Sequence, residues 1–272
     1  MEAAIRAPLT FCKNMNILAL ETTGKYGSAA VIRNDGSIFV SSSSNEMNHL
    51  RDIITISDEV IAGAGIDKKD LTHIAASVGP GSFTGIRIGV TTARTLGQVL
   101  GIPCVAVSSL LAMAERVRET AAYEGAMYVL AMINARRHQI YAGAWKISSD
   151  DETQQAALEP FMAEKQYMIE DMLAAVKKDA DKTGGRIFIT GDGIDAYEEI
   201  IREGLDSRMY ILADEELRYQ NAAEVASLAA GYAAEGRISG YDDLMPEYMR
   251  LSEAEQRLKE GTLSDKIRRT VK

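Results

Sequence analysis

Residues 77–97 read SVGPGSFTGIRIGVTTARTLG, a glycine-rich loop followed by a pattern that predicts a helix. Glycine inside a helix is destabilising by roughly 1 kcal/mol relative to alanine. Small residues nevertheless recur at every fourth position of this helix, as Gly85, Gly89, Ala93 and Gly97. A smooth stripe of this kind lets another helix approach closely. The stripe therefore predicts helix–helix packing, either within the same domain or with a partner.

The glycine-rich loop differs from the established phosphate-binding loops. No lysine follows Gly85 where a P-loop requires one, and the G-x-G-x-x-x-G spacing is not that of a dinucleotide fingerprint. Ser82 does not lie in the G-x-S-x-G turn of serine hydrolases. The backbone N–H groups of Gly79, Gly81 and Ser82 still precede a helix, so they predict a place where an anion could bind.

Working outward from this stretch, the first half of the chain reads as strands followed by helices. The order disfavours a Rossmann sheet, which needs strict strand–helix alternation. The Asn34-Asp35-Gly36 turn predicts a hairpin. The expected strands are 16–21, 28–33 and 37–43, which form an antiparallel meander, then 74–78 and 104–107; the expected helices are 48–64, 86–100 and 108–118.

The second half repeats the same succession, so the sequence predicts two α/β lobes of similar design. Strands are expected at 127–133, 139–145, 186–190 and 209–212, helices at 165–176, 196–203 and 222–235, and a polar loop at 148–155. The predicted division is a leader (1–14), a first lobe (15–108), a second lobe (109–251) and a charged tail (252–272).

The helix expected at 48–64 has a wide apolar arc, because Ile53, Ile56 and Val60 stand beside a second apolar stripe. One stripe packs on the domain's own core, and a second indicates a further packing surface. The alternative is a helix buried deeply within its own lobe.

Composition narrows the class of protein. The 272 residues carry a net charge of −9, so the chain lacks the overall basic character of a protein that binds nucleic acid alone. Cys12 and Cys104 form neither a disulfide framework nor a zinc pattern. No apolar run has the length of a membrane span. We expect a cytoplasmic protein without a membrane partner.

Metal chemistry is not expected either. Of the three histidines, His49 begins the first helix, and Ile53 stands one turn later where a His-x-x-x-His metal pair would need its second histidine. His73 and His138 are single residues. The sequence therefore predicts no catalytic metal.

GPGSFTGIRIGVTTARTLG (79–97), ILALETT (17–23) and PEYMR (246–250) together resemble the bacterial TsaB family, formerly YeaZ. The resemblance implies the two-lobed ASKHA fold of actin, sugar kinases and Hsp70. It also implies a role in making N6-threonylcarbamoyladenosine (t6A) at position 37 of tRNA. In that system the related protein TsaD carries the active site and its metal, TsaB is its required non-catalytic partner, and the ATPase TsaE joins them.

The resemblance implies that the first two helices dock on TsaD, and that the same face can pair with itself in a homodimer. Tight packing through the stripe would make Gly89→Leu abolish the complex. The expected interface residues are His49, Ile53, Ile56, Val60, Gly85, Arg87, Gly89, Val90, Ala93, Arg94 and Gly97.

The resemblance also implies an eroded ASKHA nucleotide site that binds nucleotide weakly or not at all. Asn134 stands where relatives commonly have aspartate, and an amide is the weaker ligand on the magnesium side. No intrinsic cofactor is expected, although ATP or ADP could bind at the junction with TsaD. The residues of this site are Thr22, Thr23, Gly24, Gly79, Gly81, Ser82, Asn134, Gly191 and Gly193.

Two other functions stay open at this point. One is an independent ATP-dependent ASKHA enzyme, which is disfavoured because Glu21 and Asn134 leave one carboxylate between the two hairpins. The other is a metallopeptidase of the M22 type, which lacks the second histidine. For a partner subunit, the net charge of −9 indicates that TsaD makes most contacts with the tRNA.

Overall fold

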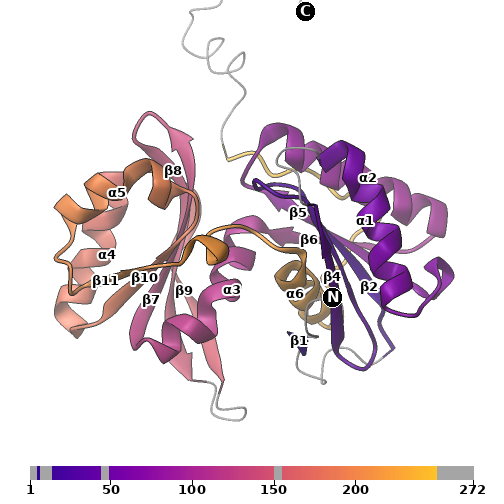
Figure 1. Cartoon of the computed structure of the whole chain (residues 1–272), viewed down its shortest axis with the longest axis horizontal. Coiled ribbons are helices and arrows are strands. Elements are labelled where there is room, and N and C mark those ends of the chain that lie inside the picture. The colour runs from indigo at the N-terminus through magenta and orange to yellow at the C-terminus, as the bar shows by residue number, and fades with distance from the viewer. Residues whose placement is uncertain (1–4, 7–13, 44–48, 150–154, 250–272) are drawn as a thin grey trace, which may run out of the picture.

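The computed structural model describes residues 5–6, 14–43, 49–149 and 155–249, which form two lobes (Figure 1). The first sheet has the strand order β1-β4-β3-β2-β5-β6, and the second has the order β11-β10-β7-β8-β9. Apart from the short β1, both sheets follow one plan. Three antiparallel strands are extended by two parallel ones, as the repeated order of elements in the sequence predicts.

The elements run in chain order through the first lobe, the second lobe and back to the first. Those of the first half are β1 (Ile5–Arg6), β2 (Ile17–Glu21), β3 (Ser28–Ile32), β4 (Ser37–Ser42), α1 (His49–Gly63), β5 (His73–Gly79), α2 (Phe83–Leu100) and β6 (Cys104–Ser108). Those of the second half are α3 (Ser109–Tyr123), β7 (Ala126–Arg136), β8 (Gln139–Ser149), β9 (Ala156–Met168), α4 (Ile169–Thr183), β10 (Arg186–Thr190), α5 (Gly193–Gly204), β11 (Tyr210–Leu212) and α6 (Ala222–Ala234).

The central strands of the first sheet are apolar on both faces because helices cover both. Every residue of β2 and β3 is buried. Leu18 and Leu20 point into the cluster shared with α1 and α2, whereas Ile17 and Ala19 point into the cluster shared with α6. Continuous apolar strands are expected where neither face meets water.

The last helix belongs to the first lobe, so the predicted second lobe of 109–251 extends too far. α6 packs on β2 and β3, and its Ala222, Ala226 and Ala229 lie in the first lobe's core. In Figure 1, α6 and α3 lie together between the two sheets. Sequence order could not show this, because an alanine-rich helix fits either sheet.

Two further predictions on the second lobe are wrong. Residues 156–168 form β9, the edge strand of the second sheet, and helix α4 begins only at Ile169 rather than at 165. The predicted loop at 148–155 begins inside β8, and 150–154 lie outside the described residues. β9 has no fully buried residue, so it lacks the apolar run by which strands are usually found.

The predicted leader contains a strand. Ile5 pairs with Ile38 and Arg6 with Ser37, so β1 extends the first sheet next to β4. The predicted tail, 252–272, lies outside the described residues. Within the described part of the chain, no helix is long and apolar enough to cross a membrane.

Candidate functional site

The loop that follows β2 closes on itself around a buried carboxylate. Glu21 is fully buried, and its Oε1 accepts hydrogen bonds from the backbone N of Thr23 (2.5 Å) and from Thr23 Oγ1 (2.6 Å). Ser77 Oγ donates to the other carboxylate oxygen. Burial raises the pKa of Glu21 above its ordinary value, although these hydrogen bonds oppose the shift. The donors of this loop therefore serve the carboxylate inside the fold.

The glycine-rich loop before α2 lies directly on the same segment. Ser82 caps α2, since its side chain accepts a hydrogen bond from the backbone N of Gly85, and its own N donates to the Thr23 carbonyl at 2.8 Å. Thr22 Oγ1 donates to the Gly85 carbonyl at 2.7 Å. A Cβ on Gly81 would lie 2.5 Å from the Thr23 carbonyl oxygen. Close backbone approach explains the glycines of this loop.

The predicted residues of the second lobe gather in a separate cluster. The backbone N of Asn134 donates to Asp192 Oδ1 at 2.9 Å, and Tyr197 donates its hydroxyl to Asn134 Oδ1 at 3.1 Å. Burial raises the pKa of Asp192. Gly191 has a φ of 110°, and a Cβ there would lie 2.0 Å from the Met132 carbonyl oxygen. Gly193 begins α5.

The predicted nucleotide residues thus form two clusters, one in each lobe, whose polar groups largely bond to one another. Gly24 is also covered, because a Cβ there would lie 2.2 Å from Gln220 Oε1. A phosphate at this loop would compete with Glu21 for the N–H and hydroxyl of Thr23. The residues present do not fit a phosphate as they lie.

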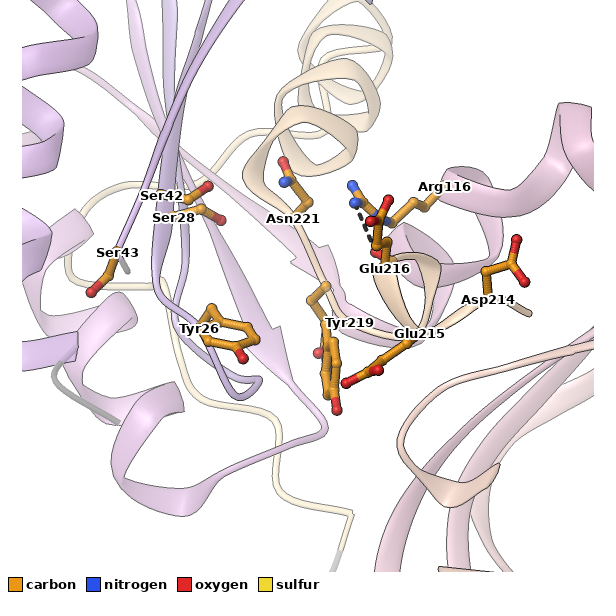
Figure 2. A pocket seen from close by; sticks show the side chains of 11 residues that line it. Tyr26, Ser28, Ser42, Ser43, Arg116, Asp214, Glu215, Glu216, Tyr219 and Asn221 are labelled. Carbon is orange, nitrogen blue, oxygen red and sulfur yellow. Dashed lines mark hydrogen bonds between the residues drawn. The ribbon is translucent and has the colours of Figure 1, made fainter. Parts of the chain in front are cut away.

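The largest of the described cavities, of about 780 Å³, is lined by other residues (Figure 2). None of the predicted nucleotide residues lines it. The rings of Tyr26 and Tyr219 meet edge to face with centroids 5.7 Å apart, and Lys25 lies 5.3 Å from the Tyr26 centroid. The full lining is Tyr26, Ser28, Ser42, Ser43, Arg116, Asp214, Glu215, Glu216, Tyr219, Gln220 and Asn221.

The charges of this cavity disfavour a polyphosphate. Arg116 donates to the Glu216 carbonyl and lies 3.6 Å from Glu224, so its charge is already compensated. Asp214, Glu215 and Glu216 are exposed. Sequence analysis missed this cavity because its lining combines a turn of the first lobe with the segment that returns to α6.

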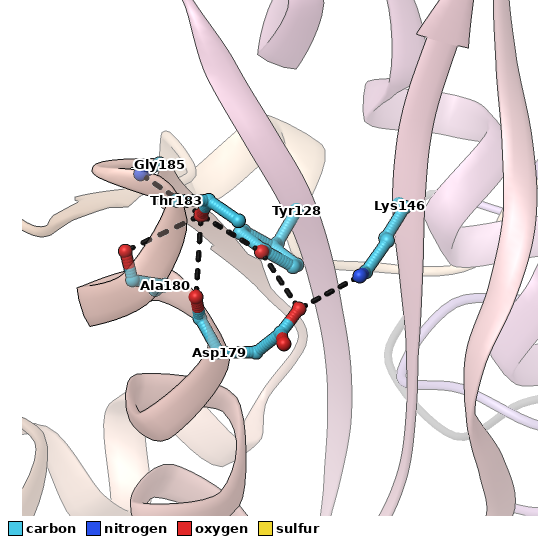
Figure 3. A network of polar contacts seen from close by, with 6 residues as sticks. All are labelled: Tyr128, Lys146, Asp179, Ala180, Thr183 and Gly185. Atoms are coloured by element: carbon cyan, nitrogen blue, oxygen red, sulfur yellow. Dashed lines mark hydrogen bonds and ion pairs between the residues drawn. The ribbon is translucent and has the colours of Figure 1, made fainter.

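A polar cluster where α4 packs on the second sheet has a structural role (Figure 3). Tyr128 is almost fully buried, and its hydroxyl donates to Asp179 Oδ2 at 2.9 Å. The same hydroxyl lies 3.0 Å from Thr183 Oγ1. Lys146 Nζ lies 2.7 Å from Asp179 Oδ2 and holds the pKa of that carboxyl below its ordinary value. The cluster ties α4 to β7 and β8.

We expect Tyr128→Phe to lower the free energy of unfolding by about 1 kcal/mol, because the ring still fills its site while one hydroxyl loses its bonds. Urea unfolding measures the change. Tyr123→Phe is the matched control, since Tyr123 is 90% exposed. Equal losses for the two variants would contradict the assigned role of the cluster.

The small-residue stripe of α2 faces the protein's own sheet, so its predicted role in helix–helix packing is wrong. Gly85, Gly89, Ala93 and Gly97 are all buried. A Cβ on Gly89 would lie 2.4 Å from Thr22 Oγ1, and one on Gly97 would lie 2.8 Å from Cys104 Sγ. The glycines allow α2 to approach the loop after β2 and strand β6. Gly89→Leu would therefore disturb the fold before it disturbed a complex.

Most of the other predicted interface residues are also internal. Ile53, Ile56, Val60 and Val90 are at most 6% exposed and lie in the core of the first lobe. The alternative reading of the first helix, burial within its own lobe, is therefore the correct one for this arc. The side chain of His49 lies outside the described part of the chain.

The outward face of the two helices carries Arg87 from the predicted set, together with Ile54, which the predicted interface did not include. Ile54 on α1 is 50% exposed, and Arg87 on α2 is exposed. The segment after α6 runs along α2. There Tyr248 accepts a hydrogen bond from Arg87 Nε at 2.8 Å, and Met245 Sδ lies 3.7 Å from Arg94 Nη1. The predicted interface arginines thus bind this returning segment.

Metal-ligating side chains do not gather in the described part of the chain, where no group of three or more His, Cys, Asp or Glu could hold an ion. His138 instead lies 2.8 Å from Glu170 Oε1.

Known proteins resemble this chain along most of its length. The family described as "TsaD: tRNA N6-adenosine threonylcarbamoyltransferase" matches residues 42–257. The "tRNA threonylcarbamoyladenosine biosynthesis protein TsaB" of Bacillus subtilis (strain 168) is 29% identical over 241 residues, covering 89% of this chain and 96% of the relative. The protein of the same name from Escherichia coli (strain K12) is 26% identical, covering 90% and 98%.

A solved structure supports the same relationship. "YeaZ from Pseudomonas aeruginosa" superposes with a TM-score of 0.70 at 26% identity, covering 86% of this chain and 99% of that one. The two lobes share one arrangement of strands, and the helices α3 and α6 lie between their sheets. This architecture defines an ASKHA protein, the class with the actin-like ATPase fold. Within that class the chain belongs to the TsaD-like family, among its TsaB (YeaZ) members.

Proposed function

We propose that this chain is the non-catalytic subunit that binds and activates a TsaD-type transferase in threonylcarbamoyl transfer to adenosine 37 of tRNA, in the cytoplasm. The full-length relatives named for t6A biosynthesis support the pathway. The observation that carries the non-catalytic role is the closed loop at Glu21. Its carboxylate is buried and saturated by Thr23 and Ser77, so it is not available for chemistry on a substrate.

The outward face of α1 and α2 is the proposed docking surface for the transferase. It combines an exposed apolar side chain, Ile54, with the arginine and tyrosine pair Arg87 and Tyr248. Aromatic residues and arginine are enriched at protein interfaces. A TsaE-type ATPase would join this pair, and ATP or ADP would bind at its junction rather than at the closed loop.

Reconstitution tests the proposal. The cognate TsaD-type and TsaE-type proteins, threonylcarbamoyl-adenylate synthase, threonine, bicarbonate, ATP and unmodified tRNA are mixed with and without this chain, and modified adenosine is measured by mass spectrometry. Product that requires this chain supports the proposal, and the chain alone should give none. Equal product without it overturns the proposal, and ATP turnover by the isolated chain would instead support an independent enzyme.

We expect Ile54→Glu to weaken binding to the cognate transferase at least about tenfold, because it buries a charge in an apolar contact. The side chain is half exposed in the free protein, so the unfolding midpoint should change little. Titration calorimetry measures the affinity. Met127→Glu is the control, since Met127 is 43% exposed on the other lobe. Unchanged affinity of Ile54→Glu would exclude this face.

A further inference from the structure

The tip of the β7–β8 hairpin has an unusual backbone. Arg136, Arg137 and His138 have φ angles of 64°, 54° and 61°. This left-handed region is uncommon for residues other than glycine. Elsewhere in the described part of the chain, only Asn14 among non-glycine residues has a positive φ. A two-residue hairpin loop requires positive φ at both central positions, here Arg137 and His138, where Asn and Gly are the usual residues.

The tip is held by hydrogen bonds on both sides. Asn134 Oδ1 accepts a bond from the backbone N of Arg136 at 2.8 Å, and Tyr197 donates to the same oxygen at 3.1 Å. On the other side, the His138 carbonyl accepts from the backbone N of Ile169 at 3.0 Å. The tip is therefore fixed to α4 and α5, and its side chains project from a rigid base.

These bonds leave two arginine side chains directed to solvent. Arg136 and Arg137 are both exposed, and neither forms an ion pair with another described residue. The nearby carboxylate of Glu170 is occupied by His138. On the adjacent strand β9, exposed Lys165 is likewise unpaired within the described residues and lies over the ring of Tyr167. The cations without an ion-pair partner at this end of the described sheet are thus Arg136, Arg137 and Lys165, although the carboxylates of Glu170 and Asp192 lie at the same end and the whole chain has a charge of −9.

We propose that this hairpin tip, with Arg136 and Arg137 as its main contacts, binds the phosphodiester backbone of RNA. The inference rests on the proposed function, in which tRNA is the substrate. Arginine binds phosphate through paired N–H donors, and such contacts position a nucleic acid without reading its sequence. The two side chains are exposed on a turn rather than recessed in a cavity, which suits an extended polyanion better than a free nucleotide.

This assignment changes which subunits are expected to contact the tRNA phosphates. The charge of −9 indicates that the transferase makes most phosphate contacts. The rigid tip would add a small number of contacts from this subunit and so fix the orientation of the tRNA on the complex.

The test compares full-length chains in complex with the cognate transferase. Binding of unmodified tRNA is measured by fluorescence anisotropy between low and moderate KCl. The variant Arg136→Gln/Arg137→Gln removes both charges, and Arg136→Lys/Arg137→Lys keeps them. Arg202→Gln/Arg208→Gln is the matched control, because those side chains are 67% and 89% exposed in ordinary surface ion pairs.

Loss of both charges should weaken tRNA binding about tenfold at moderate salt and reduce the slope of log K against log[KCl] by about two. The lysine variant and the control should stay within about twofold of wild type. Wild-type affinity and slope for the glutamine variant would overturn the inference. Equal losses of tRNA affinity for the control variant would also overturn the inference. The same holds if the glutamine variant loses only affinity for ADP or for the transferase.

These experiments distinguish failure of the proposed function from failure of the inference about the hairpin tip. If reconstituted transfer proceeds equally without this chain, the partner role fails. If transfer requires the chain but the glutamine variant binds tRNA normally, only the role of the hairpin tip is wrong.

Discussion

Gly85→Ala is expected to prevent the chain from folding stably. A Cβ at this position would lie 1.9 Å from the carbonyl oxygen of Thr22, which belongs to the backbone and has no rotamer with which to move away. Helix α2 would have to shift from the loop that closes around Glu21. We expect a loss of more than about 4 kcal/mol, a large part of the stability of an ordinary domain.

Thermal and urea unfolding measure this effect. Gly231→Ala is the matched control, because Gly231 is also inside a helix but a Cβ there would meet nothing within 4 Å. Alanine at that position should raise stability by up to about 1 kcal/mol. An unfolding midpoint for Gly85→Ala within error of the wild type would show that α2 does not press on Thr22 as described.

Glu21→Leu is expected to lower the free energy of unfolding by about 3 kcal/mol or more. The substitution leaves the N–H of Thr23 and the hydroxyl of Ser77 buried without their acceptor, whereas the Thr23 hydroxyl keeps Ser109 Oγ at 3.0 Å. Each buried group without a partner costs about 1–3 kcal/mol. Glu21→Gln should be milder, because its amide oxygen can accept from Thr23 while its NH₂ donates to Ser77.

The pH dependence of stability tests the raised pKa of Glu21 separately from its role as a hydrogen-bond acceptor. Because burial raises the pKa of Glu21, folding favours the protonated group. Its contribution to stability is therefore fully present below the unfolded pKa of about 4.5 and is lost as pH rises through the folded value. Glu21→Gln should lack this loss. Parallel stability–pH curves for Glu21→Gln and wild type would contradict the raised pKa.

Much of the fold was predictable because its signals are local. The meander of β2, β3 and β4 follows from short apolar runs and the Asn34-Asp35-Gly36 turn, and the structure confirms it. Strand β9 was missed because an edge strand leaves its side chains half-buried or exposed and so lacks a buried apolar run. The placement of α6 was missed because it depends on which sheet has an uncovered face.

The candidate site was predicted less well than the fold, because its hydrogen bonds join segments that are distant in the chain. The residues near Thr22, Gly81 and Ser82 do come together, but the sequence could not show that their donors are used by Glu21 and by one another. The left-handed backbone at Arg136 and Arg137 has no signal in composition and is seen only in the backbone angles.

The sequence by itself determined the family, the two-lobed plan and the closeness of packing around α2, because glycine spacing and strand periodicity are read along the chain. Only the tertiary structure decided what that packing serves. The same stripe at Gly85 and Gly89 would suit a partner helix or the protein's own loop, and the position of Thr22, which both glycines meet, selects the loop. A one-dimensional pattern gives the shape of a surface, whereas what lies against that surface depends on contacts between segments distant in the chain.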